Sequence, residues 1–120
     1  MKVVQKETEL DSNIIEIINK VKGKAQIIFG EKLTDVILFG SYARGDQNSE
    51  SDLDIMIIVN MDSFDLKKYR DTIVDIEVDI SLDYDIVLSI MLQSESEFKK
   101  YDKVLPFFIS IVNEGISMYG

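Results

Sequence analysis

Three apolar runs in the chain have the length and the residue types of buried β-strands. Two of them, VILF at 36–39 and IMIIV at 55–59, are rich in β-branched residues. The third is Ile86 to Leu92, within the segment SLDYDIVLSIML at 81–92. We therefore expect a small mixed sheet of about three or four strands.

Helical spacing of apolar residues predicts that helices back this sheet. The first helix runs from Ser12 to Phe29, with capping candidates at Asp11 to Asn13 and a stop at Gly30. Its apolar face comprises Ile14, Ile17, Ile18, Val21, Ala25 and Ile28. The expected fold class is α/β (α+β), in a single domain over residues 1–120.

The segment between the second and third strands fits two interpretations. After a cap at Asp62 or Ser63, apolar residues recur every three or four positions, which favours a second helix. Those residues are Leu66, Tyr69, Ile73, Ile76 and Ile80. From Val74 to Tyr84, however, apolar and polar residues also alternate strictly, as they do in a strand. We expect the helix.

The C-terminal part of the sequence predicts two more helices. Ser94 and Glu97 form a candidate capping box for a short helix that ends near Tyr101, and Pro106 suits the first turn of a last helix. The apolar face of that last helix is Ile109, Val112, Ile116 and Tyr119. Because Phe107, Phe108, Ile109, Ile111 and Val112 cannot all point inward, this stripe is either ordinary core or a partner surface.

Residues 40–54, GSYARGDQNSESDLD, join the first two predicted strands and carry most of the candidate chemistry. Gly40 allows a sharp turn, and Ser41 to Gly45 can open a short helix whose free N–H groups point at an anion. Arg44 can reach the same anion with its planar set of donors. This arrangement is typical of a phosphate-binding turn.

Asp52 and Asp54 flank one apolar residue at the start of the second strand. Residues i and i+2 of a strand share a face, so the two carboxylates lie roughly 6–7 Å apart while Leu53 points into the core. Their repulsion, ~2–3 kcal/mol, would be removed by a divalent cation. With no histidine or cysteine in the chain, oxygen ligands favour Mg²⁺ or Mn²⁺. Carboxylates beside a phosphate-binding turn indicate metal-assisted phosphoryl or nucleotidyl transfer.

GSYARG at 40–45 followed by SDLDIMI at 51–57 resembles the signature of the nucleotidyltransferase superfamily that includes DNA polymerase beta. The sequence of the motif is most similar to that of the minimal nucleotidyltransferases, small proteins commonly paired with HEPN-domain partners in prokaryotic toxin–antitoxin modules. The chain matches the superfamily pattern at every position: an apolar residue, Gly-Ser, a spacer and Asp-x-Asp. The likeness in length and element order covers the whole chain, although strong identity is confined to 40–59.

This resemblance implies a role for each residue of the motif. Asp52 and Asp54 would be catalytic and carry two Mg²⁺ ions. Gly40, Ser41 and Arg44 would bind the triphosphate of ATP.

The resemblance also implies a third catalytic, metal-binding carboxylate on a later strand. Asp85, immediately before the third apolar run, is the first candidate. Asp83 has the same parity, and Asp79 is a more distant alternative.

By the same resemblance, the chain is expected to be a Mg²⁺-dependent enzyme that transfers AMP from ATP to a hydroxyl of a HEPN-type toxin, and thereby acts as its antitoxin. The metals and the phosphate-binding turn leave no residues for an acceptor domain, so the acceptor must come from elsewhere. Two alternatives stay open. One is a small-molecule nucleotidyltransferase, similar to antibiotic-modifying members of the superfamily, with its acceptor pocket completed by a homodimer or a second subunit. The other is a non-catalytic antitoxin that binds and masks its partner.

Charge and composition limit the partners. The chain carries 22 acidic and 13 basic residues, a net charge of −9, and residues 71–98 contain acids but no base. The bases at Lys20, Lys22 and Lys24 are too few to bind a polyanion, which disfavours nucleic acid as the acceptor. The start, MKVVQKETEL, has no apolar signal region, and the longest apolar run is too short to span a membrane. We therefore expect a cytoplasmic protein.

Overall fold

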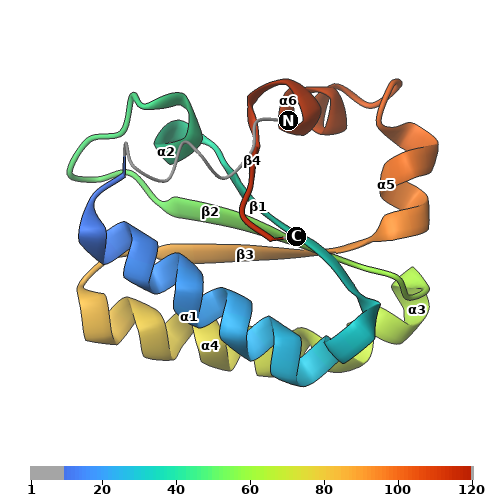
Figure 1. The fold of residues 1–120 in the computed structure, drawn as a ribbon, viewed down its shortest axis with the longest axis horizontal. Helices are drawn as coiled ribbons and strands as arrows, with labels where there is room; N and C mark the ends of the chain where they lie inside the picture. The colour runs from blue at the N-terminus through green and yellow to red at the C-terminus, as the bar shows by residue number, and fades with distance from the viewer. Residues whose placement is uncertain (1–9, 120) are drawn as a thin grey trace.

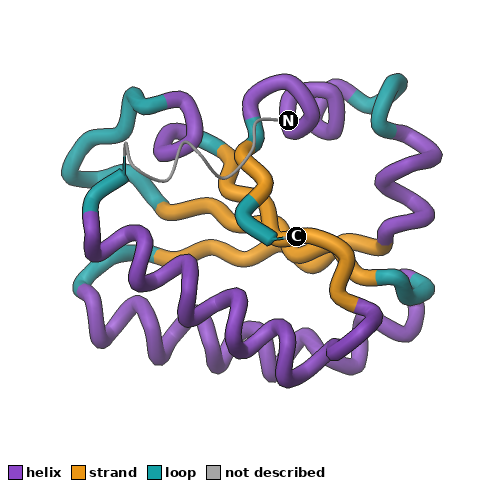
Figure 2. Tube along the Cα trace, in the orientation of Figure 1, coloured by secondary structure: helices purple, strands orange, loops and turns teal. Residues whose placement is uncertain are grey.

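The computed structural model describes residues 10–119, in which a four-stranded mixed sheet lies between two groups of helices (Figure 1 and Figure 2). The strands are β1 (Leu33–Phe39), β2 (Leu53–Val59), β3 (Leu88–Ser94) and β4 (Ile116–Ser117), in the spatial order β3-β2-β1-β4. β1 is antiparallel to both β2 and β4, whereas β2 and β3 are parallel. β3 is therefore an edge strand.

One face of the sheet carries the main hydrophobic core. Helices α1 (Ser12–Phe29) and α4 (Arg70–Tyr84) cover this face (Figure 1). α1 begins where the Asp11 carboxylate accepts a hydrogen bond from the N–H of Asn13, and it ends at Gly30, which has a positive φ. The core combines alternate residues of the central strands with the apolar helix faces, among them Ile17, Ile18, Val36, Leu38, Ile55, Ile57, Ile73 and Ile76.

The opposite face is covered only in part. Helices α5 (Glu95–Tyr101) and α6 (Pro106–Glu114) lie over it, and α2 (Ser41–Arg44) follows β1 (Figure 1). Its smaller cluster comprises Ile37, Met56, Ile58, Phe98, Phe108 and Ile111. Ser89 and Met91 of β3 lie outside this cluster and are exposed.

The expected α/β fold, with a small mixed sheet backed by helices, is confirmed. The segment between β2 and β3 is helical, as expected: α3 (Ser63–Leu66), a 3₁₀ turn (Lys67–Tyr69) and α4 follow one another, and Asp62 caps α3. The strand interpretation of 74–84 is wrong, because its exposed apolar residues follow a helical spacing of four on α4: Val74, Val78 and Leu82. None of the helices within residues 10–119 is long and apolar enough to cross a membrane.

Two local expectations in the region of β3 are wrong. The strand begins at Leu88 rather than Ile86, because α4 continues to Tyr84 and Asp85 then adopts a left-handed conformation with φ 51°. Ser94 does precede α5, but its hydroxyl makes no capping bond and pairs with the Ser96 hydroxyl at 3.0 Å.

The last helix is shorter than the sequence suggested. It begins at Pro106, as expected, but ends at Glu114, and Ile116 belongs to β4, where it pairs with Leu38. The N–H of Gly115 still bonds to the Ile111 carbonyl, after which the backbone is extended. The C-terminal residues therefore complete the sheet instead of adding a turn of helix.

Candidate active site

Asp54 and its neighbours define the site at one end of the sheet. Asp54 is the second residue of β2, and its register partners are Phe39 on β1 and Ser89 on β3. Leu53 and Ile55 on either side of it are fully buried in the main core. Because side chains alternate along a strand, Asp54 points to the incompletely covered face. Asp52 immediately precedes the strand and is exposed.

The turn at Gly40 packs directly against the Asp54 carboxylate. Gly40 has φ 74° and ψ −155°, and a Cβ added there would overlap Asp54 Oδ2. The Gly40 carbonyl accepts the N–H groups of Ala43 and Arg44, which closes the single turn of α2. This conformation, open to glycine but strained for other residues, brings the start of α2 and the carboxylate together.

Arg44 lies at the end of α2 with its guanidinium exposed. Its Nε donates to Asp46 Oδ2 at 3.2 Å, and its Nη1 donates to Glu114 Oε2 at 3.4 Å at the end of α6. The hydrogen bond and charge of Asp46, followed by those of Glu114, raise the pKa of Arg44 above its usual value. Arg44 therefore links the turn that follows β1 to the C-terminal helix.

Burial and like charge act together on Asp54. Partial burial raises the pKa of the Asp54 carboxyl above its usual value, the neighbouring Asp52 raises it further, and Arg44 opposes both. Both effects disfavour the ionised carboxylate, and both would be offset by a cation between the two aspartates.

Asp85, the candidate third carboxylate, is not brought into a cluster with Asp52 and Asp54. It caps the C-terminus of α4, and β3 starts three residues later. Asp79 and Asp83 lie within α4, with their side chains exposed. No group of three or more carboxylates within residues 10–119 is arranged to hold a metal ion. The metal role of Asp85 therefore stays a prediction.

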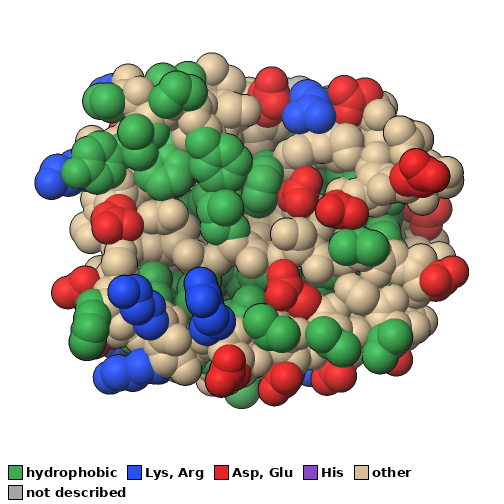
Figure 3. All heavy atoms as spheres, turned by 180° about the vertical axis from the view of Figure 1, so that it is seen from behind, with side chains coloured by type: hydrophobic (Ala, Val, Ile, Leu, Met, Phe, Trp, Pro, Cys, Tyr) green, Lys and Arg blue, Asp and Glu red, His purple; other side chains and the backbone are tan. Residues whose placement is uncertain are grey.

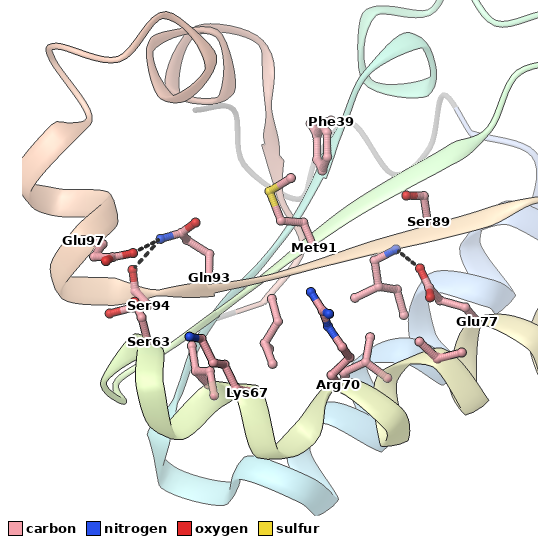
Figure 4. A pocket seen from close by; sticks show the side chains of 15 residues that line it. Phe39, Ser63, Lys67, Arg70, Glu77, Ser89, Met91, Gln93, Ser94 and Glu97 are labelled. Atoms are coloured by element: carbon pink, nitrogen blue, oxygen red, sulfur yellow. Dashed lines mark hydrogen bonds between the residues drawn. The ribbon is translucent and has the colours of Figure 1, made fainter.

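A cavity of about 480 Å³ runs along β3 and includes the two strand neighbours of Asp54 in its lining (Figure 4). It is lined by Phe39 and Ser89, the two register neighbours of Asp54, and extends along β3 to α3, α4 and the start of α5. Its charged residues are Lys67, Arg70, Glu77 and Glu97. The sequence analysis missed these residues. Only the position of Arg70, the last base before the acidic stretch 71–98, offered a signal.

The fold and the juxtaposed turn and aspartates are those of a nucleotidyltransferase. The model of the nucleotidyltransferase domain family matches residues 14–116, and the chain belongs to this family.

Two relatives from Methanocaldococcus jannaschii match nearly the whole chain. The protein MJ0141 is 39% identical over 105 residues, which cover 88% of this chain and 98% of the relative. The protein MJ0604 is 33% identical over 106 residues, which cover 88% of this chain and 94% of the relative. Both carry the provisional name of a protein adenylyltransferase. The chain is thus similar over its length to proteins named for the transfer of AMP to proteins.

Two solved structures share the fold. One is a crystal structure described as a toxin–antitoxin with AMP-PNP, with a TM-score of 0.52 and 20% identity, covering 85% of this chain and 72% of that one. The other is a variant of the toxin–antitoxin MntA–HpeT, with a TM-score of 0.52, 18% identity and the same coverage. At these identities the likeness establishes the arrangement of helices and strands.

Proposed function

We propose that this chain transfers AMP from ATP to a hydroxyl group of a partner protein, a HEPN-type toxin, and thereby acts as its antitoxin. The observation that carries this proposal is the packing of Gly40 against Asp54, because it sets a phosphate-binding turn beside a carboxylate pair. The relatives named as protein adenylyltransferases and the toxin–antitoxin structures of the same fold support the choice of acceptor.

Asp52 and Asp54 are the residues that would hold Mg²⁺, or Mn²⁺ in its place. Mg²⁺ is commonly bound by one or two carboxylates together with substrate phosphates, so a pair of aspartates is a sufficient protein contribution. The repulsion that raises the pKa of Asp54 would favour cation binding. When bound, the metal would neutralise charge on the phosphates. Asp85 is kept as the candidate for a third carboxylate on the strength of the sequence motif.

The turn after β1 would bind the triphosphate. The N–H groups of Ser41 and Tyr42 at the start of α2 have no acceptor among the described residues, so they are available to phosphate oxygens. Arg44, held at present by Asp46 and Glu114, is exposed and can exchange these carboxylates for phosphate. Gly40, Ser41 and Arg44 are thus the proposed nucleotide-binding residues.

The group transfer itself is a displacement at the α-phosphorus of ATP. The acceptor oxygen forms a bond to that phosphorus, the bond to the bridging oxygen breaks, and pyrophosphate leaves. The proton of the acceptor hydroxyl passes to solvent or to a nearby carboxylate.

The proposal is tested by incubating the chain with ATP labelled at the α-phosphate, Mg²⁺ and a HEPN-type toxin as the candidate partner. We expect label on the partner with the wild type, and a loss of at least ~10³-fold in the Asp52→Asn and Asp54→Asn variants, because a metal-binding carboxylate stabilises charge throughout the transfer. Glu50→Gln, an exposed acid two residues before Asp52, is the matched control and should keep wild-type activity.

Each contrary result selects one of the alternatives. Toxin inhibition that persists in Asp54→Asn, with no label transferred by the wild type, would identify an antitoxin that acts by binding alone. Label on an added aminoglycoside but not on the protein would identify a small-molecule nucleotidyltransferase. Undiminished labelling by Asp85→Asn would remove Asp85 from the catalytic residues without affecting the rest of the proposal.

A further inference from the structure

The cavity that includes the strand neighbours of Asp54 runs along the outer edge of β3. It begins at Phe39 and Ser89, which flank Asp54 in the sheet, and passes Met91 and Gln93 towards α5. Figure 4 shows Lys67 and Arg70 reaching up from the helices below β3, towards the strand. A molecule at the end of this cavity formed by Phe39 and Ser89 would therefore lie beside the two strand neighbours of Asp54.

The two cations of the cavity are available to a ligand. Neither Lys67 nor Arg70 has a carboxylate within 4.0 Å among residues 10–119. The cavity also carries two carboxylates, and each accepts a hydrogen bond from within the chain: Glu77 from the N–H of Ile90 at 2.6 Å, and Glu97 from Gln93 Nε2 at 3.5 Å. Figure 3 shows the molecule from behind relative to Figure 1. On this side, basic side chains lie below a recess and hydrophobic side chains lie above it.

The backbone edge of β3 also offers a binding group. The N–H of Leu88 donates to Ser81 Oγ at 3.0 Å, and that of Ile90 donates to Glu77, so alternate residues of β3 turn their N–H groups towards α4. The N–H of Leu92 has the same parity and has no acceptor within the described part of the chain. An N–H left open on an edge strand can donate a hydrogen bond to the backbone of an extended segment of another protein.

We propose that this cavity binds an extended, acidic segment of the acceptor protein, whose carboxylates pair with Lys67 and Arg70. This inference rests on the proposed function, since it assigns the part of the partner that flanks the modified hydroxyl. The charge of the chain supports an acidic occupant: at a net charge of −9, most of the surface repels an acidic segment, whereas Lys67 and Arg70 are two cations of the cavity without a carboxylate within 4.0 Å among residues 10–119. Lys67 and Arg70 are therefore specificity-determining residues.

The first experiment measures binding without catalysis. A fluorescent oligo-glutamate peptide is titrated with the full chain, and its anisotropy is followed at low salt. We expect binding by the wild type, and a loss on the order of tenfold or more in affinity for Arg70→Glu and for Lys67→Glu. Lys24→Glu is the matched control, because Lys24 is an exposed helical lysine on α1 outside the cavity, and it should bind as the wild type does.

The second experiment follows label transfer to the partner. In Arg70→Glu we expect KM for the partner to rise on the order of tenfold while KM for ATP is unchanged, and thermal melting should show that the variant is folded. Replacing the acidic residues that flank the modified hydroxyl by lysine should lower activity with the wild type and restore it with Arg70→Glu.

The two proposals fail in different ways. If the wild type labels the partner and Arg70→Glu has the same KM for it, the acceptor segment lies elsewhere and this inference is overturned. If no label is transferred by any form, the proposed function fails, and peptide binding still decides whether the cavity takes an acidic segment. Equal binding of oligo-glutamate by the wild type and both cavity variants would contradict it directly.

Discussion

The two faces of the sheet differ in how completely helices cover them. On one face, α1 and α4 bury the alternate residues of β1 and β2 in a continuous hydrophobic core. On the other face, α5 and α6 cover only part of the strands, and Phe39, Ser89 and Met91 stay at least partly exposed near Asp54. The central strand β2 contributes to both faces. Successive residues of that strand therefore point in turn into the main core and to the partly covered face.

The difference shows how a small domain can hold two neighbouring carboxylates that repel each other. Asp54 is held between Leu53 and Ile55, both fully buried, so its backbone position is fixed by the covered face. On the partly covered face, the Asp54 carboxylate then stays partly accessible to solvent. The charge repulsion between Asp52 and Asp54 is tolerated because the core on the opposite face supplies the stability.

The largest effect should come from truncating the covered face. Ile57 on β2 is 1% exposed, and Ile57→Ala should lower the free energy of unfolding by ~3 kcal/mol because it leaves a cavity in the main core. Met91 on β3 faces the other side and is 39% exposed, so Met91→Ala should cost less than ~1 kcal/mol. Denaturant unfolding of both variants measures the contrast. Equal losses would mean that the two faces contribute alike, against the division made above.

A smaller effect on stability is expected at Gly40, in the turn between β1 and α2. Gly40→Ala should lower the free energy of unfolding by ~2 kcal/mol, since the backbone there is strained for alanine and the new methyl group would displace the Asp54 carboxylate. It should also reduce label transfer. Gly23→Ala is the matched control: Gly23 lies inside α1 with nothing within 4 Å of an added Cβ, and it should be stabilised by ~0.5–1 kcal/mol. An active, fully stable Gly40→Ala variant would show that the close approach is not required.

The motif and the covered face could be predicted from the sequence because their signals are local. The apolar runs at 36–39 and 55–59, the Gly-Ser turn and the alternation around Leu53 each depend on neighbouring residues alone. The helical spacing of Ile73, Ile76 and Ile80 likewise outweighed the alternation of the same segment, since those residues do face the core.

The arrangement of residues on the partly covered face could not be predicted in the same way. The placement of Ser89 beside Asp54 depends on the register of two parallel strands, and the sequence does not state a register. The sequence predicts Asp85 directly before a strand, whereas in the structure α4 continues to Tyr84 and Asp85 ends that helix. The end of α4 depends on its packing, which the local sequence does not show. Ile116 fits a helical stripe, yet its place beside β1 follows from a pairing that joins residues far apart in the chain.

The smallest effect concerns a half-buried carboxylate away from the site, Asp35 on β1. Burial raises the pKa of Asp35 above its usual value, although the Ser117 hydroxyl donates to Oδ1 at 2.7 Å and the N–H of Val36 donates to it at 2.8 Å. A folded-state pKa above the unfolded value means that the ionised form costs stability at neutral pH, and that this cost disappears as the pH falls through the folded-state pKa. Asn can accept the same two hydrogen bonds without a charge.

Asp35→Asn should therefore be more stable than the wild type at pH 7, by an amount on the order of 0.5 kcal/mol because solvent screens a partly exposed group. The advantage should shrink as the pH is lowered and vanish below the unfolded-state pKa. Denaturant unfolding at a series of pH values measures it, with Asp75→Asn on the exposed side of α4 as the control for replacing a surface carboxylate. A variant less stable than the wild type at pH 7 would mean that the bonds from Ser117 and Val36 to the charged carboxylate outweigh its burial. The partly covered face would then stabilise a charge at Asp35 while it disfavours one at Asp54.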